Sequence, residues 1–450
     1  NNEAIDAYLV ELGVASVEQL DDEQAELIAY SCIIDNGDES AYESPDFPQG
    51  NAAFSKSDLN DRTITCDEIV QDDGTTYYEL NGKCRVVKFD VQLSNGYLHE
   101  MGDVIAPSNE MVPDLIREAD NMHVMGVLLN ATGWAGKLTD FIDLEYENAE
   151  HEQSVKLPNL ATFPVAQHRY LGYTALVETD DVYAKYNVPM PENYNVEDGT
   201  CSNLEAIIAA IRPIAEKAYG TEAQDDITNE RNAINRFVAY HFLEGKMAHN
   251  KFVNHFCAYG YKWGDILNPQ QTELTVDLTD YFYTTGSMRG LVKITHEAKS
   301  KELYANRVCT YDVDGSYEQT GVKHRGVKVL ATNPSATNPE ELNENNAKNG
   351  YYYPVDDLFI LDSATADALG GERIRFDITT ILPELLNNGC RSQSYQYFDN
   401  NNYFSNISGC SDDTKLLYLT TASQGAYGWC DLEGDEFMVL GIYDFVLKLP

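Results

Sequence analysis

Basic residues are scarce in this chain. Its 450 residues hold 31 Lys and Arg against 73 Asp and Glu, which gives a formal net charge of −42. Nucleic-acid binding depends on Lys and Arg side chains that neutralise phosphates, so this charge argues against a nucleic-acid partner. The excess is strongest in residues 1–107, with 23 acidic and 5 basic side chains. A hydrated surface is the simplest interpretation, and an acidic face that docks a basic partner or collects divalent cations is the alternative.

Metal-binding and redox motifs are also missing. The nine cysteines include no CxxC pair, which argues against zinc-ribbon and thioredoxin-type sites. Two interpretations of the cysteines stay open, namely buried free thiols and one or two disulfides. His249 and His255 do not have the i, i+4 spacing of a helical metal pair. Residues 312–315 (Asp-Val-Asp-Gly) lack the Gly and Glu positions of an EF-hand, so they favour a hairpin turn. We expect no metal and no cofactor.

Catalytic signatures are equally absent. The chain has no GxSxG, SxxK, Walker or GxGxxG pattern, and nothing singles out a catalytic pair among its acidic residues. It also has no run of about 18 apolar residues, so the sequence predicts no membrane-spanning helix. A hydrolase is therefore only a third-ranked hypothesis, and we expect a protein without enzymatic activity.

Two kinds of sequence block occur twice. Asn95-Gly96-Tyr97 and Asn349-Gly350-Tyr351 are each followed by an Asp eight residues after the Asn, at Asp103 and Asp357. An apolar stretch follows each Asp, and we expect it to form a closing strand. Further upstream, residues 27–33 resemble residues 237–243, so that Tyr30-Ser31 corresponds to Tyr240-His241. Two block types that recur in the same order indicate a duplicated domain.

Hydrophobic spacing predicts helices and strands within each copy. Ser202 and Glu205 form a capping-box pattern at the start of a helix that Pro213 kinks and Gly220 ends. A second helix is expected to run up to Gly245, with His241 on its apolar side. One predicted strand alternates, with its inward residues being Val87, Phe89, Val91 and Leu93. Helices early and strands late in the repeat indicate an α+β fold.

The motif around Tyr240-His241, with the Asn-Gly-Tyr block that follows it, resembles the fasciclin-type adhesion domain. Residues 125–134 are similar to the first helix of that family, and residues 173–183 to its first strand with the acidic turn and helix. Three positions depart from the family pattern. Glu178-Thr179 stands in place of Pro-Thr, Ser31 in place of the motif His, and Tyr353 where the first copy keeps His99.

The resemblance implies tandem fasciclin-type domains followed by a β-rich C-terminal domain. We expect the C-terminal part of a first domain over 1–107, a complete second domain over 108–365 and a truncated β-sandwich-like tail over 366–450. Ten residues then belong to the structural motifs: Tyr30, Asn95, Gly96, His99, Asp103, Tyr240, His241, Asn349, Gly350 and Asp357. His241 in particular is expected to be buried, neutral and hydrogen-bonded within its own domain.

The function that the resemblance implies is adhesion. We expect an extracellular binding protein on the bacterial outer membrane, held by a lipid anchor upstream of residue 1 and recognising a protein or a glycan. The alternative is an accessory subunit of an outer-membrane nutrient-import or assembly complex. Tyr351-Tyr352-Tyr353 favours core packing, whereas Tyr395, Tyr397 and Tyr403 lie in an Asn-rich stretch and are candidate glycan contacts. Asp362-Ser363-Ala364 resembles a short O-glycosylation signal, with Ser363 as the acceptor.

Overall fold

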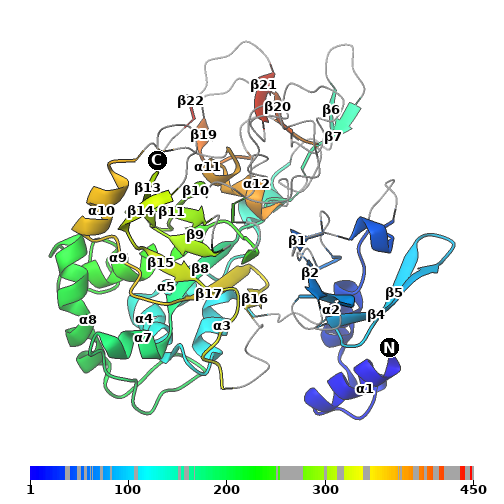
Figure 1. The fold of residues 1–450 in the computed structure, drawn as a ribbon, viewed down its shortest axis with the longest axis horizontal. Helices are drawn as coiled ribbons and strands as arrows, with labels where there is room; N and C mark the ends of the chain where they lie inside the picture. The colour runs from blue at the N-terminus through cyan, green and yellow to red at the C-terminus, as the bar shows by residue number, and fades with distance from the viewer. Residues whose placement is uncertain are drawn as a thin grey trace. The chain divides into compact units, whose positions relative to one another are not determined.

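The computed structural model covers the 450 residues and fixes the placement of most of them. It describes residues 1–35, 41–47, 52–54, 58–60, 62, 64–70, 74–81, 84–105, 110–150, 154–156, 162–166, 168–249, 252–253, 277–297, 300, 302–311, 319–337, 345–372, 374, 378–388, 395–399, 403–408, 415–419, 436–440 and 446–447. Figure 1 shows the course of the chain.

The chain divides into two compact units. Unit 1 comprises Asn1–Asn109 with Ala248–Lys251, and unit 2 comprises Glu110–Met247 with Phe252–Pro450. Both units mix helices with sheets, so the fold class is α+β. No helix of the described residues is long and apolar enough to cross a membrane.

Unit 1 is built from short helices and one antiparallel sheet. The helices are α1 (Asn2–Glu11) and α2 (Asp22–Ser31). The sheet has the order β1-β2-β3-β4-β5, with strands Ala52–Ala53, Thr65–Val70, Thr76–Leu80, Cys84–Gln92 and Tyr97–Met101. Its core is an apolar cluster that includes Phe47, Phe54, Ile64 and Val86. A side-chain capping box starts α2, because Asp21 accepts from the Gln24 backbone and Gln24 accepts from that of Asp21.

The inward face predicted for β4 is only partly right. Phe89 and Val91 are half-buried, but Val87 and Leu93 are exposed, and the residues buried at the start of the strand are Cys84 and Val86. The register between β4 and β5 shifts twice, between Val86 and Lys88 and again before Val91. A bulge adds a residue on one strand and exchanges the inward and outward faces, which simple alternation cannot anticipate.

Unit 2 is organised around a nearly closed sheet. Seven strands follow the order β10-β11-β12-β15-β17-β8-β9, and β16 pairs with β17. Their bounds are β8 Tyr173–Glu178, β9 Phe242–Glu244, β10 Leu278–Tyr283, β11 Leu291–His296, β12 Leu303–Ala305, β15 Val327–Val329, β16 Asn346–Ala347 and β17 Gly350–Val355. An antiparallel bridge between Leu243 and Thr284 brings the two ends of this order together.

Strand β17 lies in the middle of the sheet and is buried along its whole length. It runs parallel to β8, with Gly350 opposite Tyr173 and Val355 opposite Glu178. A Cβ atom at Gly350 would lie 1.7 Å from the Tyr173 carbonyl oxygen, so this close approach requires glycine. The three tyrosines that follow are at most 4% exposed, which confirms that they pack in the core.

Helices α3, α4, α7 and α8 lie together on one side of this sheet (Figure 1). Their bounds are α3 Val112–Glu118, α4 His123–Thr132, α5 Trp134–Lys137, α6 Leu144–Asn148, α7 Asp180–Lys185, α8 Leu204–Tyr219 and α9 Ala233–Tyr240. The apolar spacing of α8 is real, since Ile207, Ile211 and Ala215 are buried, and the helix passes through Pro213 to end at Gly220.

Two predicted helix boundaries are wrong. The N-cap of α8 is Asn203, not Ser202, whose hydroxyl instead donates to the Glu192 carbonyl oxygen. The second helix, α9, ends at Tyr240 and not at Gly245, because residues 242–244 pair with β8 as strand β9. Tertiary pairing with a buried strand overrides the local helical pattern there.

The C-terminal part of unit 2 contains α10 (Ser363–Leu369), α11 (Ile378–Ile381) and α12 (Pro383–Asn387). Strands β18 (Tyr395–Asp399), β20 (Lys415–Leu419) and β21 (Glu436–Leu440) form an antiparallel sheet, and β19 (Ile407–Ser408) pairs with β22 (Val446–Leu447). Short antiparallel pairs complete the structure: β6 (Ser154–Lys156) with β7 (Thr162–Pro164), and β13 (Val308–Tyr311) with β14 (Gln319–His324).

Candidate binding groove

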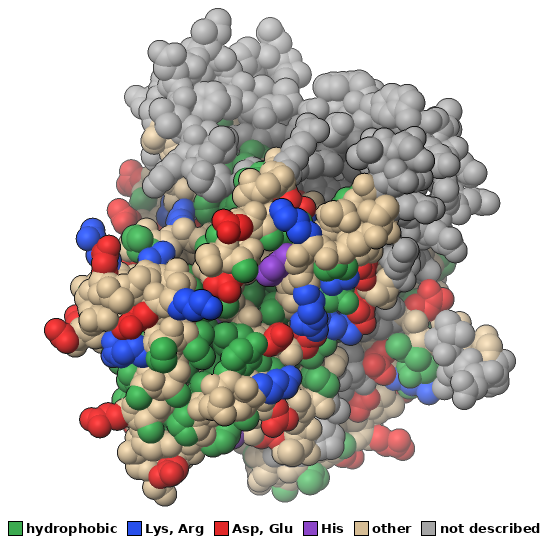
Figure 2. Space-filling model, turned by 60° about the vertical axis from the view of Figure 1, so that its left-hand side comes forward, with side chains coloured by type: hydrophobic (Ala, Val, Ile, Leu, Met, Phe, Trp, Pro, Cys, Tyr) green, Lys and Arg blue, Asp and Glu red, His purple; other side chains and the backbone are tan. Residues whose placement is uncertain are grey.

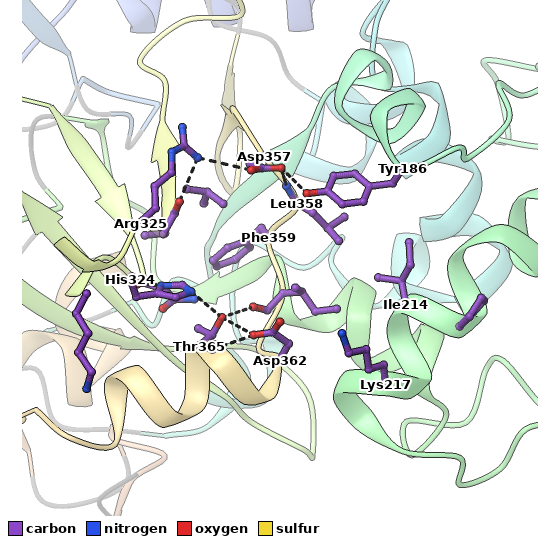
Figure 3. Close-up of a pocket in the computed structure, with 17 residues that line it drawn as sticks. Tyr186, Ile214, Lys217, His324, Arg325, Asp357, Leu358, Phe359, Asp362 and Thr365 are labelled. Carbon is purple, nitrogen blue, oxygen red and sulfur yellow. Dashed lines mark hydrogen bonds and ion pairs between the residues drawn. The ribbon is translucent and has the colours of Figure 1, made fainter. Parts of the chain in front are cut away.

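A hollow of about 610 Å³ opens on the surface of unit 2, and we call it the groove. It is lined by Tyr186, by residues 213, 214 and 217 of α8, by 305–306, by 323–327, by 357–360 and 362, and by Thr365 of α10. Figure 2 shows a face where hydrophobic side chains are bordered by Lys, Arg, Asp and Glu, and Figure 3 shows the groove itself. Its size falls within the range of about 300–1,000 Å³ that is usual for ligand sites.

The floor of the groove is mainly aliphatic. Ile214 and Pro213 come from α8, and Leu358 and Ile360 come from the segment that follows β17. Phe359 lies between the last two and is only 1% exposed. A floor of this kind favours apolar side chains of a ligand, because their contact surface leaves water on binding.

A tight turn brings one wall of the groove into place. Gly326 joins β14 to β15 with φ +64°, and a Cβ atom there would lie 2.2 Å from the Ala305 carbonyl oxygen. Only glycine fits this turn against the end of β12. The turn positions three consecutive basic residues, Lys323, His324 and Arg325, at the edge of the hollow.

The upper polar rim is internally paired. Arg325 forms ion pairs with Asp356 and with Asp357, the latter at 3.7 Å, and the hydrogen bond to Asp356 raises the pKa of the Arg325 guanidinium. Tyr186 donates from its hydroxyl to Asp357 at 2.6 Å. Burial, followed by this contact with Asp357, raises the pKa of Tyr186 to about 12. These charges therefore satisfy one another before any ligand arrives.

The lower rim is held by the start of α10. Asp362 caps this helix by accepting from the Thr365 backbone and hydroxyl. Burial raises the pKa of Asp362, but the two Thr365 bonds and the charges of His324 and Lys217 outweigh it, so the net direction is down. His324 contacts the Asn306 carbonyl oxygen through Nδ1 at 2.8 Å, so Nδ1 carries a proton, and Nε2 faces the Thr365 hydroxyl at 3.4 Å.

Two lysines at the rim differ from these paired groups. Lys217 and Lys323 are both exposed, and neither forms a hydrogen bond or ion pair within the part of the chain that the structure describes. Lys217 extends from α8 toward Asp362 (Figure 3) and influences that carboxylate only through its charge. The Lys323 Nζ atom lies 3.2 Å from where a Cβ atom of Gly371 would stand, outside the lining of the groove. The groove therefore offers one unengaged ammonium group, that of Lys217, in a chain of net charge −42.

A buried acid–histidine pair supports the floor from behind. His241 is completely buried, with Nδ1 2.7 Å from the Phe237 carbonyl oxygen and Nε2 2.7 Å from Glu178 Oε2. Glu178 also accepts from the Tyr183 hydroxyl at 3.0 Å and from the Phe359 backbone N–H at 2.6 Å. The pair thus fixes the backbone of Phe359, the central residue of the floor.

The pair also settles where its protons lie. A carbonyl oxygen can only accept, so Nδ1 of His241 carries a proton, and a second proton lies between Nε2 and Glu178 Oε2. The burial and hydrogen bonding expected of His241 are present. The neutrality expected of the ring stays a prediction.

The two helix-end motifs have a similar local geometry. Tyr30 lies in the last turn of α2 and Tyr240 is the last residue of α9. Ser31 is fully buried and donates to the Leu27 carbonyl oxygen at 2.7 Å, as the His241 ring does to the carbonyl four residues before it. Ser31 therefore repeats the local bond of the histidine, without a carboxylate partner in any bond that the structure records for it.

Each of the two Asn-Gly blocks leads into a strand, but the surroundings of the two blocks differ. Asn95 is exposed in the turn between β4 and β5. Asn349 is instead buried, accepts from the Val112 N–H and donates to the Leu138 and Asp140 carbonyl oxygens. In both blocks the strand lies before the Asp, and the described residues that follow Asp103 (104–105) and Asp357 (358–372) form no closing strand of the kind expected. Asp103 is exposed, whereas Asp357 lines the groove.

His99 belongs to an aromatic cluster of unit 1. Its ring lies 4.9 Å from that of Phe47, and Nε2 contacts the Tyr42 carbonyl oxygen at 3.0 Å. Tyr353 stands at the matching place in the second block. It is 1% exposed and donates from its hydroxyl to the Met247 carbonyl oxygen at 2.9 Å. Both residues thus pack within their own units.

The candidate glycan contacts need a correction. Tyr403 is 1% exposed, packs with Phe398 and Phe404, and donates from its hydroxyl to the His168 carbonyl oxygen, so it cannot stack on a sugar. The Asn-rich composition around it suggested exposure, but its ring fills an apolar cluster with Leu382 and Leu416. Tyr395 and Tyr397 lie on β18, with side chains outside the described residues. Ser363 is exposed at the first position of α10.

No group of three or more His, Cys, Asp or Glu side chains that could hold a metal ion occurs among the described residues. His255 and residues 312–315 lie outside them. Five cysteines are free thiols: Cys32, Cys66, Cys84, Cys201 and Cys309. The other four cysteines, at positions 257, 390, 410 and 430, lie outside the described residues.

Sequence reasoning did not find the groove. Its charged residues come from α8, from the β14–β15 turn and from the segment after β17, which lie far apart in the chain. One signal was available, since Lys323-His324-Arg325 is a basic run in an otherwise acidic sequence. The partner of His241 also came from a distance, because Glu178 lies 63 residues away.

Comparison with known proteins found a likeness among solved structures only. No family model matches the chain, and no curated protein matches it. Among solved structures, it is similar to a FAS1 domain pair from the insect cell adhesion molecule fasciclin I, at 12% sequence identity. The match covers 81% of this chain and 88% of that one, with a TM-score of 0.28.

Proposed function

We propose that this chain is a non-enzymatic, fasciclin-type binding protein that recognises a partner outside the cell through the groove of unit 2. The observation that carries the proposal is the groove itself, an open hollow of about 610 Å³ with an aliphatic floor and an unengaged lysine, Lys217, at its rim. The repeated sequence blocks and their resemblance to adhesion domains support the same kind of role.

The groove is better suited to binding than to catalysis. The lining side chains that most resemble a catalytic hydroxyl–imidazole pair are Thr365 and His324, with 3.4 Å between Oγ1 and Nε2. The Thr365 hydroxyl is buried, and its proton is directed to Asp362 at 2.9 Å and the Ile360 carbonyl at 3.3 Å. A nucleophile must reach its substrate and pass its proton to a base, and Thr365 is arranged for neither.

The setting that fits this role is the outer surface of a bacterial outer membrane, with a lipid anchor upstream of residue 1. The strongly acidic surface suits a protein that stays dispersed near an anionic membrane and touches it only through such an anchor. The partner in this setting is another surface or outer-membrane protein, or a glycan.

The test is capture of the partner with a charge-reversed groove. The full-length protein is purified from native membranes in mild detergent beside a Lys217→Glu/Lys323→Glu variant. A Lys88→Glu/Arg231→Glu variant makes the same charge change at exposed residues outside the groove, and is the control. We expect the parent and the control to retain a co-eluting partner that the groove variant loses. If all three proteins retain it equally, the groove is not the binding site.

The identity of what co-elutes also decides the class of function. Components of a nutrient importer or of an assembly machinery would favour the accessory-subunit alternative, and a soluble or cell-surface partner would favour adhesion.

A further inference from the structure

Two carboxyl groups of unit 2 lie where the end of β9 packs against α12, away from the groove. Glu244 is the last residue of β9, and Glu384 is the second residue of α12. The two segments are in close contact, because a Cβ atom at Gly245 would lie 2.8 Å from Leu386 Cδ1. Both acids therefore belong to the contact between a strand of the central sheet and a helix of the C-terminal part.

One of these carboxylates has a buried oxygen without a hydrogen-bond donor. Glu384 is 4% exposed and accepts from the Ser405 N–H through Oε1 at 2.7 Å, but its Oε2 has no partner in the part of the chain that the structure describes. Glu244 contacts Arg289 Nη2 through Oε1 at 3.0 Å. A buried acceptor is costly to leave unpaired, and a proton on the neighbouring carboxyl group supplies the donor that Glu384 Oε2 lacks.

The charges around Glu244 favour the same arrangement. Burial, opposed by Arg289 and supported by the charge of Glu384, raises the pKa of Glu244 to about 7. The other titratable groups that face it are Tyr173 of β8 and Tyr283 of β10, and burial raises the pKa of both phenols, so they stay protonated near neutral pH. Two adjacent carboxyl groups in a buried site hold one proton between them more readily than they hold two charges.

Helix α12 connects this contact to the apolar cluster of the C-terminal part. Leu385, which follows Glu384, packs in that cluster with Phe398 and Tyr403. Glu384 itself binds the Ser405 backbone, which adjoins the same cluster. A change of charge at Glu384 therefore acts on the helix and on the segment that the helix anchors.

We propose that Glu244 and Glu384 share one proton, that this proton holds α12 against β9, and that its loss at higher pH loosens α12 and the cluster attached to it. With both acids ionised, two like charges face each other in a largely buried contact. Helix α12 then keeps the neutral bond from the Lys246 N–H to Asn387 Oδ1, together with the bond that Asn388 accepts. The helix therefore opens locally while the central sheet stays folded.

Hydrogen exchange of the intact protein, followed by mass spectrometry across neutral pH, tests the proposal. Protection is corrected for the intrinsic exchange rate and compared between peptides from α12 and peptides from α8, which takes no part in the contact. The pKa of Glu244 is raised on folding, so the added protection is complete below about pH 4.5 and is lost as pH rises through about 7. We expect α12 to lose about tenfold in protection between about pH 6 and about pH 8, and α8 to lose none.

Neutral variants should remove this pH dependence. Glu384→Gln places an amide N–H₂ where it can donate to Glu244, and Glu244→Gln places one where it can donate to Glu384 Oε2. In either variant α12 should stay protected at both pH values. Glu244 is the more exposed of the two acids, so its variant gives the same test if Glu384→Gln does not fold. Glu205→Gln, at an exposed position of α8, is the matched control and should lose protection in α12 as the parent does.

A fourth variant separates a shared proton from a merely structural contact. The Arg289 guanidinium favours the ionised form of Glu244, so Arg289→Gln should move the midpoint of the α12 transition to higher pH. A contact that only packs the helix has no midpoint for this charge to move.

Four results would overturn the inference. Equal protection of α12 at the two pH values would mean that no proton is lost there. An unchanged pH dependence in Glu384→Gln would mean that Glu244 titrates without sharing its proton. A midpoint that stays in place in Arg289→Gln would mean that another group titrates. An equal loss of protection in α8 would mean that the whole unit, and not α12, responds to pH.

Discussion

Replacing His241 by Ala should lower the unfolding free energy of unit 2 by more than the replacement of any exposed residue does. His241 and Glu178 are both fully buried, and their 2.7 Å contact compensates a carboxylate that also holds Tyr183 and Phe359. In His241→Ala, the Glu178 carboxylate keeps its two donors, the Tyr183 hydroxyl and the Phe359 N–H. It loses the imidazole that balances it in a site without water contact. Breaking one side of a buried pair of this kind typically costs about 3–5 kcal/mol.

The intact chain is unfolded in urea, and its unfolding is monitored by circular dichroism and by the exposure of the unit 2 core. The matched control is His168→Ala, because His168 pairs with Glu147 but is largely exposed. An exposed pair contributes at most about 1 kcal/mol, so this variant should unfold close to the parent.

A double-mutant cycle assigns the loss to the pair. Glu178→Gln alone should destabilise unit 2, and Glu178→Gln combined with His241→Ala should cost less than the sum of the two single changes, because the partners interact directly. The reasoning is refuted if His241→Ala unfolds at the same urea concentration as the parent. It is also refuted if the two single costs add without coupling.

Three further outcomes follow from the same structure. Gly350→Ala should disrupt the β8–β17 pairing and cost at least about 2 kcal/mol in urea unfolding, since its Cβ would lie 1.7 Å from the Tyr173 carbonyl oxygen, whereas Gly136→Ala, with no atom within 4 Å, should not destabilise the fold. Burial, together with Glu384 and against Arg289, raises the pKa of Glu244 from 4.5 to about 7. The folded state therefore binds the Glu244 proton more tightly than the unfolded state does. The resulting contribution to the free energy of unfolding, up to about 3 kcal/mol, is present below about pH 4.5 and is lost as pH rises through about 7. Glu244→Gln should remove that part of the pH dependence in urea titrations at several pH values. Asn235→Ala should cost about 1–3 kcal/mol on thermal melting, because it leaves the buried Trp134 indole N–H and the Thr132 carbonyl without partners.

Some of the fold could be predicted because local patterns decided it. The apolar spacing of α8 placed Ile207 and Ile211 in the core, and Gly220 ended the helix as expected. The three tyrosines of β17 also packed where their position beside a strand pattern placed them. In these cases the side chains that matter lie within a few residues of one another along the chain.

Other features depended on contacts that a single segment does not reveal. The bulges of β4 turned Val87 outward, and the pairing of β9 with β8 ended α9 before Gly245. Asn203, not Ser202, caps α8, because the Ser202 hydroxyl is used by the loop at Glu192. Tyr403 was drawn into an apolar cluster by residues from other segments.

The groove shows the same limit for function. His241 could be singled out from its motif, but its partner Glu178 stands where the resembling family has proline, so the family pattern gave no hint of the pair. The two rim lysines carry no motif at all. They become a candidate site only when the turn at Gly326 and the helix α8 bring them to one hollow.

The central claim is that the partner sits in the groove, and site-specific photo-crosslinking on native membranes tests it most directly. A benzophenone side chain is placed at Ile214, on the floor, and separately at Met190, an exposed position that does not line the groove. We predict an adduct with one partner protein from position 214, suppressed by Lys217→Glu/Lys323→Glu, and no such adduct from position 190. An adduct from both positions, or one from position 214 that the lysine variant does not reduce, would contradict the account.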